Sequence, residues 1–392
     1  MAPNLRPRKF RPSFVAEEEP PSKKPAIEPT INLLALPEDL VLCCLARVSR
    51  LYYPTLSLVS NTFRSLTSSP ELYQTRSLFN RTENCIYVCL QFPTEPNLRW
   101  FTLCRKPDKT LNNHTTCKKK KKKTENSSGN VLAPVRILNS PPPHVEWSNL
   151  VAVGHRLYAI ISDDVPCPSS FFFLDCRTHT WVETPSLRLA HTLQVSDGDE
   201  LDGMMYLAEG YENPESLNCV EVFDVKTQTW NPVPPEKRIF RAKDFQGKAC
   251  KNRDRLSFPA NIKDSTLGFV GPGAWCLIGR VLCLYDSYED EFKWWDSDEE
   301  IDCWREVKGL EGLPKFSPDC NVYSIDCGGK MVVFWDKYVP SRAGYKEKMI
   351  WCAEISLEMR SNEEVWGKVE WMDAVLKVPK SYKFVYASAA TL

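Results

Sequence analysis

Histidine is the side chain that most often binds metals or moves protons in enzymes, and this chain has only five of them. They are His114, His144, His155, His179 and His191. His114 lies near a run of lysines and the others fall in strand or turn positions, so we interpret all of them as structural or exposed residues. The sequence also lacks a Gly-x-Ser-x-Gly nucleophile motif, a glycine-rich phosphate loop and a His-Glu-x-x-His motif. We therefore expect no enzyme activity, no catalytic residues, no metal site and no cofactor.

Two charged segments could bind a partner. Lys118–Lys123 could hold phosphate or act as a nuclear signal, or it could be a solvated loop within 105–130; no aromatic residues alternate with the lysines to stack on bases. Asp286 to Asp302 holds nine acids and one lysine, Lys293. It could be an acidic face for a basic substrate segment, or a solvated hairpin. The whole chain has 50 basic and 50 acidic residues, which gives no support for a nucleic-acid or membrane partner.

The sequence also indicates a compartment. It begins without an apolar signal segment, and no apolar run is long enough to span a bilayer. We therefore expect an intracellular protein, in the cytoplasm, the nucleus or both. The 16 cysteines are scattered without a Cys-x-x-Cys pair, which favours buried reduced thiols. Residues 1–30 are rich in proline and charge, and we expect a disordered tail there.

A repeat of about 50 residues organises the middle of the chain. A glycine, an aspartate and a tryptophan return 49 residues later, as the pairs Gly154 and Gly203, Asp175 and Asp224, and Trp181 and Trp230. This period, with a strand and a turn before the tryptophan, is typical of a β-propeller blade of the kelch type. We expect the glycine at the head of a first strand to allow close approach or positive φ. The aspartate should accept backbone N–H groups in a turn, and the tryptophan should pack between blades.

The repeats extend over most of the region 84–392. The clearest run from about 144–187, 189–235, 267–314 and 322–366, whereas 240–266 is polar and lacks a tryptophan. The sequence therefore predicts a mainly β fold with a propeller of five or six blades. Because a closed propeller leaves no open sheet edge, we expect residues 382–392 to join the sheet formed by residues 85–104.

Residues 31–77 have a helical pattern. Pro37, Glu38 and Asp39 suit a helix start, and the apolar spacing predicts a first helix to Val48, a second after Pro54 and a third from Pro70 to Ser77. Three short helices cannot bury all of their apolar residues among themselves. The surplus indicates a surface that binds a partner.

The same residues carry a resemblance to a known family. Leu33-Leu-Ala-Leu-Pro-Glu-Asp-Leu-Val, Leu56-Ser-Leu-Val-Ser and Ser69-Pro-Glu-Leu-Tyr closely resemble the F-box motif of plant-type F-box/kelch-repeat proteins. With the repeats, the resemblance covers most of the chain. It implies a substrate-recognition subunit of an SCF-type cullin-RING E3 ubiquitin ligase, in which the F-box binds the Skp-type adaptor and the propeller binds a target protein of unknown identity.

The resemblance also assigns the residues that bind the adaptor. These are Leu36, Pro37, Leu40, Leu45, Val48, Leu58, Val59 and Phe63. The alternative is a kelch propeller that acts as a protein or small-ligand interaction module without ligase assembly. In that case the helical unit would serve only as a hydrophobic cap.

Overall fold

The computed structural model describes residues 36–93, 95–106, 128–139, 150–160, 171–185, 194–195, 204–208, 220–231, 273–296, 304–317, 320–340 and 346–392. Four predicted features lie wholly or mostly outside these residues: the tail 1–30, the lysine-rich loop, Gly203 and the segment 240–266. The chain divides into two units, Met1–Val41 and Leu42–Leu392. Each is described by itself.

The N-terminal helices are more numerous than predicted, although the helix predicted from Pro70 to Ser77 is present with one further residue. They are α1 (Glu38–Ala46), the 3-10 helix η2 (Arg50–Tyr52), α2 (Tyr53–Leu56), α3 (Asn61–Leu66) and α4 (Pro70–Leu78). The predicted second helix is two helices, because Ser60 caps a new one: its side chain accepts a hydrogen bond from the Phe63 N–H at 3.1 Å. Ser69 caps α4 in the same way, through the Leu72 N–H at 3.3 Å.

The rest of the described chain forms five four-stranded sheets. In hydrogen-bonded order, the first sheet is β20 (Lys383–Thr391), β1 (Asn84–Gln91), β2 (Arg99–Arg105) and β3 (Asn130–Val135). The second is β4 (Val151–Val153), β5 (Arg156–Ile160), β6 (Phe171–Asp175) and β7 (Thr180–Thr184), and the third is β11 (Thr229–Asn231), β10 (Val220–Asp224), β9 (Met204–Ala208) and β8 (Gln194–Val195). The fourth is β12 (Trp275–Ile278), β13 (Val281–Asp286), β14 (Glu291–Asp296) and β15 (Arg305–Glu306), and the fifth is β16 (Val322–Asp326), β17 (Lys330–Tyr338), β18 (Glu347–Ser361) and β19 (Glu364–Pro379).

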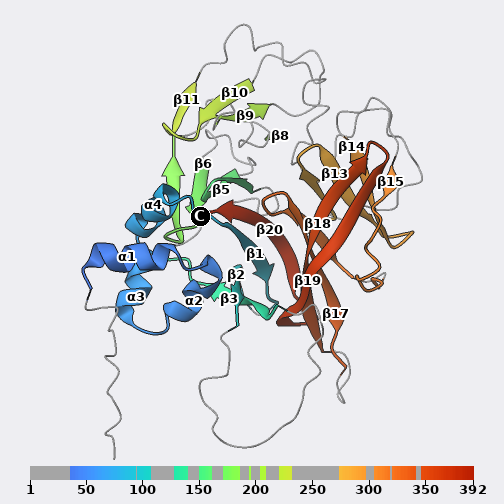
Figure 1. Cartoon of the computed structure of the whole chain (residues 1–392), viewed down its shortest axis with the longest axis horizontal. Coiled ribbons are helices and arrows are strands. Elements are labelled where there is room, and N and C mark those ends of the chain that lie inside the picture. The colour runs from blue at the N-terminus through green and yellow to red at the C-terminus, as the bar shows by residue number, and fades with distance from the viewer. Residues whose placement is uncertain are drawn as a thin grey trace, which may run out of the picture. The chain divides into compact units, whose positions relative to one another are not determined.

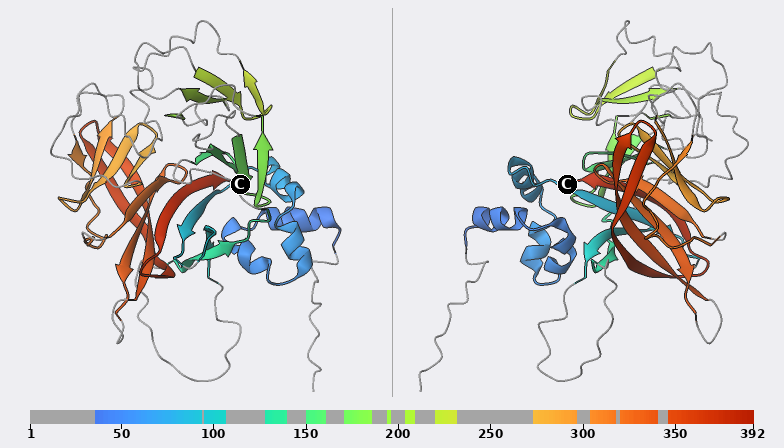
Figure 2. Two further views of the ribbon diagram at one scale, coloured as in Figure 1. Left: turned by 180° about the vertical axis from the view of Figure 1, so that it is seen from behind. Right: turned by 45° about the vertical axis from the view of Figure 1, so that its right-hand side comes forward.

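These sheets confirm the predicted fold class. Their strand pairs are antiparallel, and four antiparallel strands per repeat is the composition of a propeller blade. Five such sheets lie within the described residues. The fifth sheet extends beyond its predicted boundary at residue 366, because β19 continues to Pro379 beside β18, which is similarly long (Figure 2).

The first sheet is closed by the last strand, as predicted. β20 lies antiparallel alongside β1, with Cys85 opposite Ala390 and Tyr87 opposite Ser388 (Figure 1). The ladder continues past the strand ends, since Glu83 N donates to the Leu392 carbonyl at 2.7 Å. The strand pair predicted around residues 85–104 is also confirmed, as β1 with β2.

The core consists of apolar layers between neighbouring sheets. Side chains of the first and fifth sheets meet in one cluster around Val88 and Phe334, and those of the first and second sheets meet in another around Tyr87. Trp294 and Trp335, both almost completely buried, join the fourth and fifth sheets. Each sheet therefore depends on its neighbours to bury its faces.

Most of the described cysteines belong to these layers. Eleven are free thiols and seven of these are buried, which confirms the predicted buried thiols at those seven positions. Burial raises the pKa of Cys85 to about 11 and that of Cys283 to about 12, so both are protonated at neutral pH. Within the described residues, no helix combines the length and apolar character required to cross a membrane.

Candidate functional site

The start of α1 carries two exposed leucines. Leu36 is 36% exposed, Leu40 is 50% exposed, and Pro37 is exposed as well. The Pro37 carbonyl accepts hydrogen bonds from Leu40 N at 3.0 Å and Val41 N at 3.1 Å, so the turn that holds the leucines is ordered. Acidic residues occupy this first turn, where the helix dipole favours negative charge. The start of α1 thus presents apolar side chains to solvent on a formed helical turn.

In the second unit, the turn after α2 carries another exposed pair. Leu58 is 77% exposed and Val59 is 66% exposed. Their backbone N–H groups bond to the carbonyls of Thr55 at 3.1 Å and Leu56 at 3.0 Å, which fixes the turn. Large apolar side chains held in water by an ordered backbone are typical of a binding surface.

The other predicted adaptor residues differ from this expectation. Leu45 and Phe63 are buried, and Val48 is half-buried. Little of the Leu45 and Phe63 side chains is accessible in this conformation, so they contribute less exposed apolar surface than Leu36, Leu40, Leu58 and Val59 do. Helical spacing does not distinguish a side chain that packs in the core from one that binds a partner, because both lie on the same kind of apolar stripe.

A buried arginine that the sequence analysis did not single out holds the helical unit together. Arg76 in α4 is 1% exposed. Its guanidinium donates to the Val48 carbonyl at 2.8 Å, the Tyr53 hydroxyl at 3.1 Å and the Arg81 carbonyl at 2.5 Å. It also forms an ion pair with the Glu83 carboxylate at 3.2 Å. One side chain therefore joins the end of α1, the start of α2 and the segment that leads into β1.

Arg50 continues this network into the sheets. Its backbone N–H donates to the Glu83 carboxylate at 2.6 Å, and its guanidinium donates to the Cys176 carbonyl, after β6, at 3.3 Å. The Tyr87 hydroxyl in β1 donates to the same carbonyl at 2.7 Å and lies 3.1 Å from Nε2 of His179. These bonds fix the 3-10 helix against the first and second sheets.

We expect this contact to be sensitive to acid through His179. Burial, and then the charge of Arg50, lower the pKa of His179 to about 4. In the unfolded chain the ring takes up a proton near its usual pKa of about 6.5. The contribution of the neutral His179 ring to stability is therefore fully present above that pH and is lost as the pH falls toward 4. When the pH is lowered from about 7.5 to about 5, the free energy of unfolding of the wild type should fall by about 1–2 kcal/mol more than that of His179→Asn. Urea unfolding at the two pH values measures the difference.

A matched control exists in the next repeat. His179 has φ 56° and Gln228, at the same place in its own turn, has φ 57°, a backbone conformation that asparagine tolerates well. Gln228→Asn should keep the pH dependence of the wild type. The same pH dependence in His179→Asn and the wild type would contradict the assignment.

The repeated aspartates cap hairpin turns. Oδ1 of Asp175 and Oδ1 of Asp224 each accept a hydrogen bond from the backbone N–H two residues later, at 2.8 Å in both turns. Asp286 accepts the equivalent bond at 2.9 Å in the fourth sheet, within the repeat predicted over 267–314.

The other repeated residues lie at or near the contacts between sheets. Trp181 is buried between the first and second sheets, whereas Trp230 is half-buried and donates its ring N–H to the Pro185 carbonyl at 2.8 Å. Gly154 has φ 54° and lies in the turn between β4 and β5, not at the head of a first strand. Its carbonyl accepts a hydrogen bond from Thr391 N at 2.8 Å, which links the second sheet to β20.

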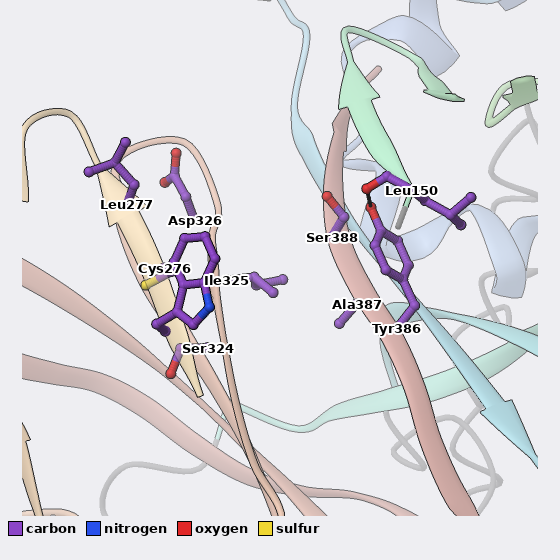
Figure 3. Close-up of a pocket in the computed structure, with 10 residues that line it drawn as sticks. Leu150, Cys276, Leu277, Ser324, Ile325, Asp326, Tyr386, Ala387 and Ser388 are labelled. Carbon is purple, nitrogen blue, oxygen red and sulfur yellow. Dashed lines mark hydrogen bonds between the residues drawn. The ribbon is translucent and has the colours of Figure 1, made fainter. Parts of the chain in front are cut away.

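A small cavity lies between β12, β16 and β20 (Figure 3). It measures about 50 Å³, and Ser324 and Tyr386 are among its lining residues. The Tyr386 hydroxyl donates to the Leu150 carbonyl at 2.9 Å. Ligand pockets usually measure about 300–1,000 Å³, so this cavity gives no support to a small-ligand site.

The predicted chemistry of the histidines can be examined only at His155 and His179, since the other three lie outside the described part. Both are in turns of the second sheet region, and burial lowers the pKa of each to about 4. In the described ranges, no group of three or more His, Cys, Asp or Glu side chains is arranged to hold a metal ion.

A small N-terminal helical unit followed by four-stranded antiparallel sheets defines an F-box with a kelch-type β-propeller. Comparison with known proteins agrees. The F-box domain model matches residues 33–75, and the "FKB95, Kelch-repeats domain" model matches residues 100–376.

Full-length relatives are also similar to this chain. It is 53% identical to the Putative F-box/kelch-repeat protein At4g39600 of Arabidopsis thaliana, over 94% of this chain and 99% of the relative. It is 52% identical to F-box/kelch-repeat protein At5g48990 of the same plant, over 91% of this chain and 95% of the relative. The chain belongs to the F-box/kelch-repeat family.

Proposed function

We propose that this chain is the substrate-recognition subunit of an SCF-type cullin-RING E3 ubiquitin ligase. The observation that carries the proposal is the F-box match over residues 33–75, which contains the exposed Leu36, Leu40, Leu58 and Val59. These side chains would dock on a Skp-type adaptor. Apolar anchors of this kind supply most of the affinity when helices bind a partner.

In this proposal the kelch repeats bind the target protein and other subunits supply the catalysis. The mechanism is proximity: a bound target is held where a ubiquitin-loaded enzyme can reach its lysines. A stiff link between the two binding parts makes such positioning effective. The hydrogen bonds of Arg50 to Glu83 and Cys176 support this role, because they fasten the 3-10 helix to the sheets. The proposal places the protein in the cytoplasm or nucleus.

The adaptor interaction can be tested with a double change at the start of α1. Leu36→Ala with Pro37→Ala removes exposed apolar surface and should weaken adaptor binding by at least about 30-fold, equivalent to about 2 kcal/mol. Binding of purified full-length chain to an immobilised Skp-type adaptor measures this. Because both residues are exposed, the thermal unfolding of the variant should match that of the wild type.

Leu138→Ala with Pro93→Ala is the control, since both of these residues are exposed outside the F-box. It should bind the adaptor as the wild type does. If the wild type does not bind, or the Leu36 and Pro37 variant binds with full affinity, the ligase role fails. The interaction module without ligase assembly then takes its place.

A further inference from the structure

A groove of about 400 Å³ lies along the edge of the fourth sheet. One side is the start of β14, and the other is the chain from Glu306, the last residue of β15, to Phe316. The Val307 N–H donates to the Phe292 carbonyl at 2.8 Å, which holds the two sides together at one end. The groove is much larger than the cavity between β12, β16 and β20.

The floor of the groove is apolar. Phe292, Val307 and Phe316 line it and are each at least nine-tenths buried. Phe316 packs edge-on against Phe292, with ring centroids 6.2 Å apart. Leu310 and Leu313 are half-buried on the wall, so a large apolar side chain entering the groove would meet hydrocarbon on several sides.

The rim of the groove is acidic. Glu291, Glu306 and Glu311 are exposed at its mouth, and Lys315 is the one cationic residue among the lining side chains. Within the described residues none of the three glutamates forms a salt bridge. Lys293 of the same strand offsets their charge only in part, since its ammonium forms ion pairs with Asp286 at 2.8 Å and Glu289 at 2.6 Å.

Two of the rim glutamates, Glu291 and Glu306, repel each other. Partial burial, and then the negative charges of Glu306 and Glu289, raise the pKa of Glu291. Like charges held close together are unfavourable, and a bound cation relieves that repulsion. The rim therefore favours a positively charged partner.

Hydrogen bonds hold both sides of the groove in place before any partner binds. Asp290 accepts hydrogen bonds from Phe316 N at 3.1 Å and from the Tyr285 hydroxyl at 2.6 Å, which fixes the far side. The chain after β15 is pinned to the fifth sheet, because Lys308 N donates to the Val365 carbonyl at 3.0 Å. Little conformational entropy is left to lose on binding, so a modest contact area can give useful affinity.

We propose that this groove binds a segment of a partner protein in which arginine or lysine alternates with large apolar residues. The apolar side chains would enter the groove and the cations would pair with Glu291, Glu306 and Glu311 at the rim. As a description of how a ubiquitination target is recognised, this inference rests on the proposed function. It adds the kind of side chains that the target would present to the groove. The chain's own run Lys118–Lys123 fits less well, because it contains no apolar residues to fill the floor.

Binding can be measured by fluorescence anisotropy with full-length chain and labelled synthetic peptides in which arginine or lysine alternates with leucine or phenylalanine. Glu306→Gln with Glu311→Gln should weaken binding by about tenfold or more. Replacing arginine by citrulline in the peptide, which keeps the shape and removes the charge, should have a similar effect. Glu71→Gln with Glu363→Gln, which changes two exposed acids elsewhere, should bind as the wild type does.

Four results would overturn the proposal. They are the absence of binding by the wild type, equal binding by the Glu306 and Glu311 variant, displacement of the peptide by calcium chloride at constant ionic strength, and tighter binding when Lys118–Lys123 are replaced by serines. The third would indicate a cation site, and the fourth an occupant from the chain itself. No adaptor is present in this assay, so the groove and the adaptor interaction fail or succeed independently.

Discussion

A chain truncated after Ser381 is expected to be insoluble and to lose most of its sheet structure. The truncation removes β20, whose residues pair with β1 from Asn84 to Gln91 and bury Tyr386, Ala387 and Ala390. It also leaves β1, an almost continuously buried strand, as an open sheet edge that can pair with other chains. The soluble fraction after expression and the far-UV circular dichroism of the soluble material measure the effect.

A synthetic peptide of residues 382–392 provides a direct control for this truncation. Added during refolding, it should restore solubility by supplying the missing strand. A peptide of the same composition in scrambled order should not. Full solubility of the truncated chain with an unchanged spectrum would mean that β20 does not hold the first sheet together.

Arg76→Met is expected to reduce the free energy of unfolding by about 3–5 kcal/mol, because several buried oxygen acceptors lose their donor at about 1–3 kcal/mol each. Methionine fits the space but leaves the Glu83 carboxylate without its ion-pair partner and the carbonyls of Val48 and Arg81 without their donor. Urea unfolding of the full chain, followed by tryptophan fluorescence and by circular dichroism, measures the loss.

Arg64→Met is the matched control. Arg64 is exposed in α3, and within the described residues its side chain donates one hydrogen bond, to the Ser57 carbonyl at 3.2 Å. An exposed residue of this kind should change stability by less than about 0.5 kcal/mol. Equal stabilities of the Arg76 and Arg64 variants would show that the buried guanidinium is not needed to hold the helical unit together.

The fold was largely predictable because its repeat carries local signals. Asp175 and Asp224 mark turns that any sequence comparison within the chain can find, and the unpaired strand at the C-terminus requires a partner strand. The predicted end of the last repeat, at residue 366, lies too early because β19 continues to Pro379. Its pairing with β18 includes register shifts, which no residue pattern indicates.

The candidate sites were less predictable, for two physical reasons. Leu45 and Leu58 have the same residue type and both suit an apolar surface, yet one is buried and the other 77% exposed, a difference set only by tertiary packing. Arg76 lies in a polar helix, where arginine is usually solvated. Its burial follows from carbonyls and a carboxylate that the chain brings together from three other segments.

The closure of the first sheet also sets a delay during protein synthesis. The side chains of Asn84 and Thr391 are hydrogen bonded at 2.8 Å although 307 positions separate them. At about 5–20 residues per second, β1 leaves the ribosome roughly 15–60 s before β20 can pair with it. Throughout that interval β1, an apolar strand, has no β20 to pair with. The interval is long compared with the microseconds to milliseconds of chain collapse and collision. The yield of folded protein in a cell should therefore depend on how well chaperones cover β1 for that time, and slower translation should lower it.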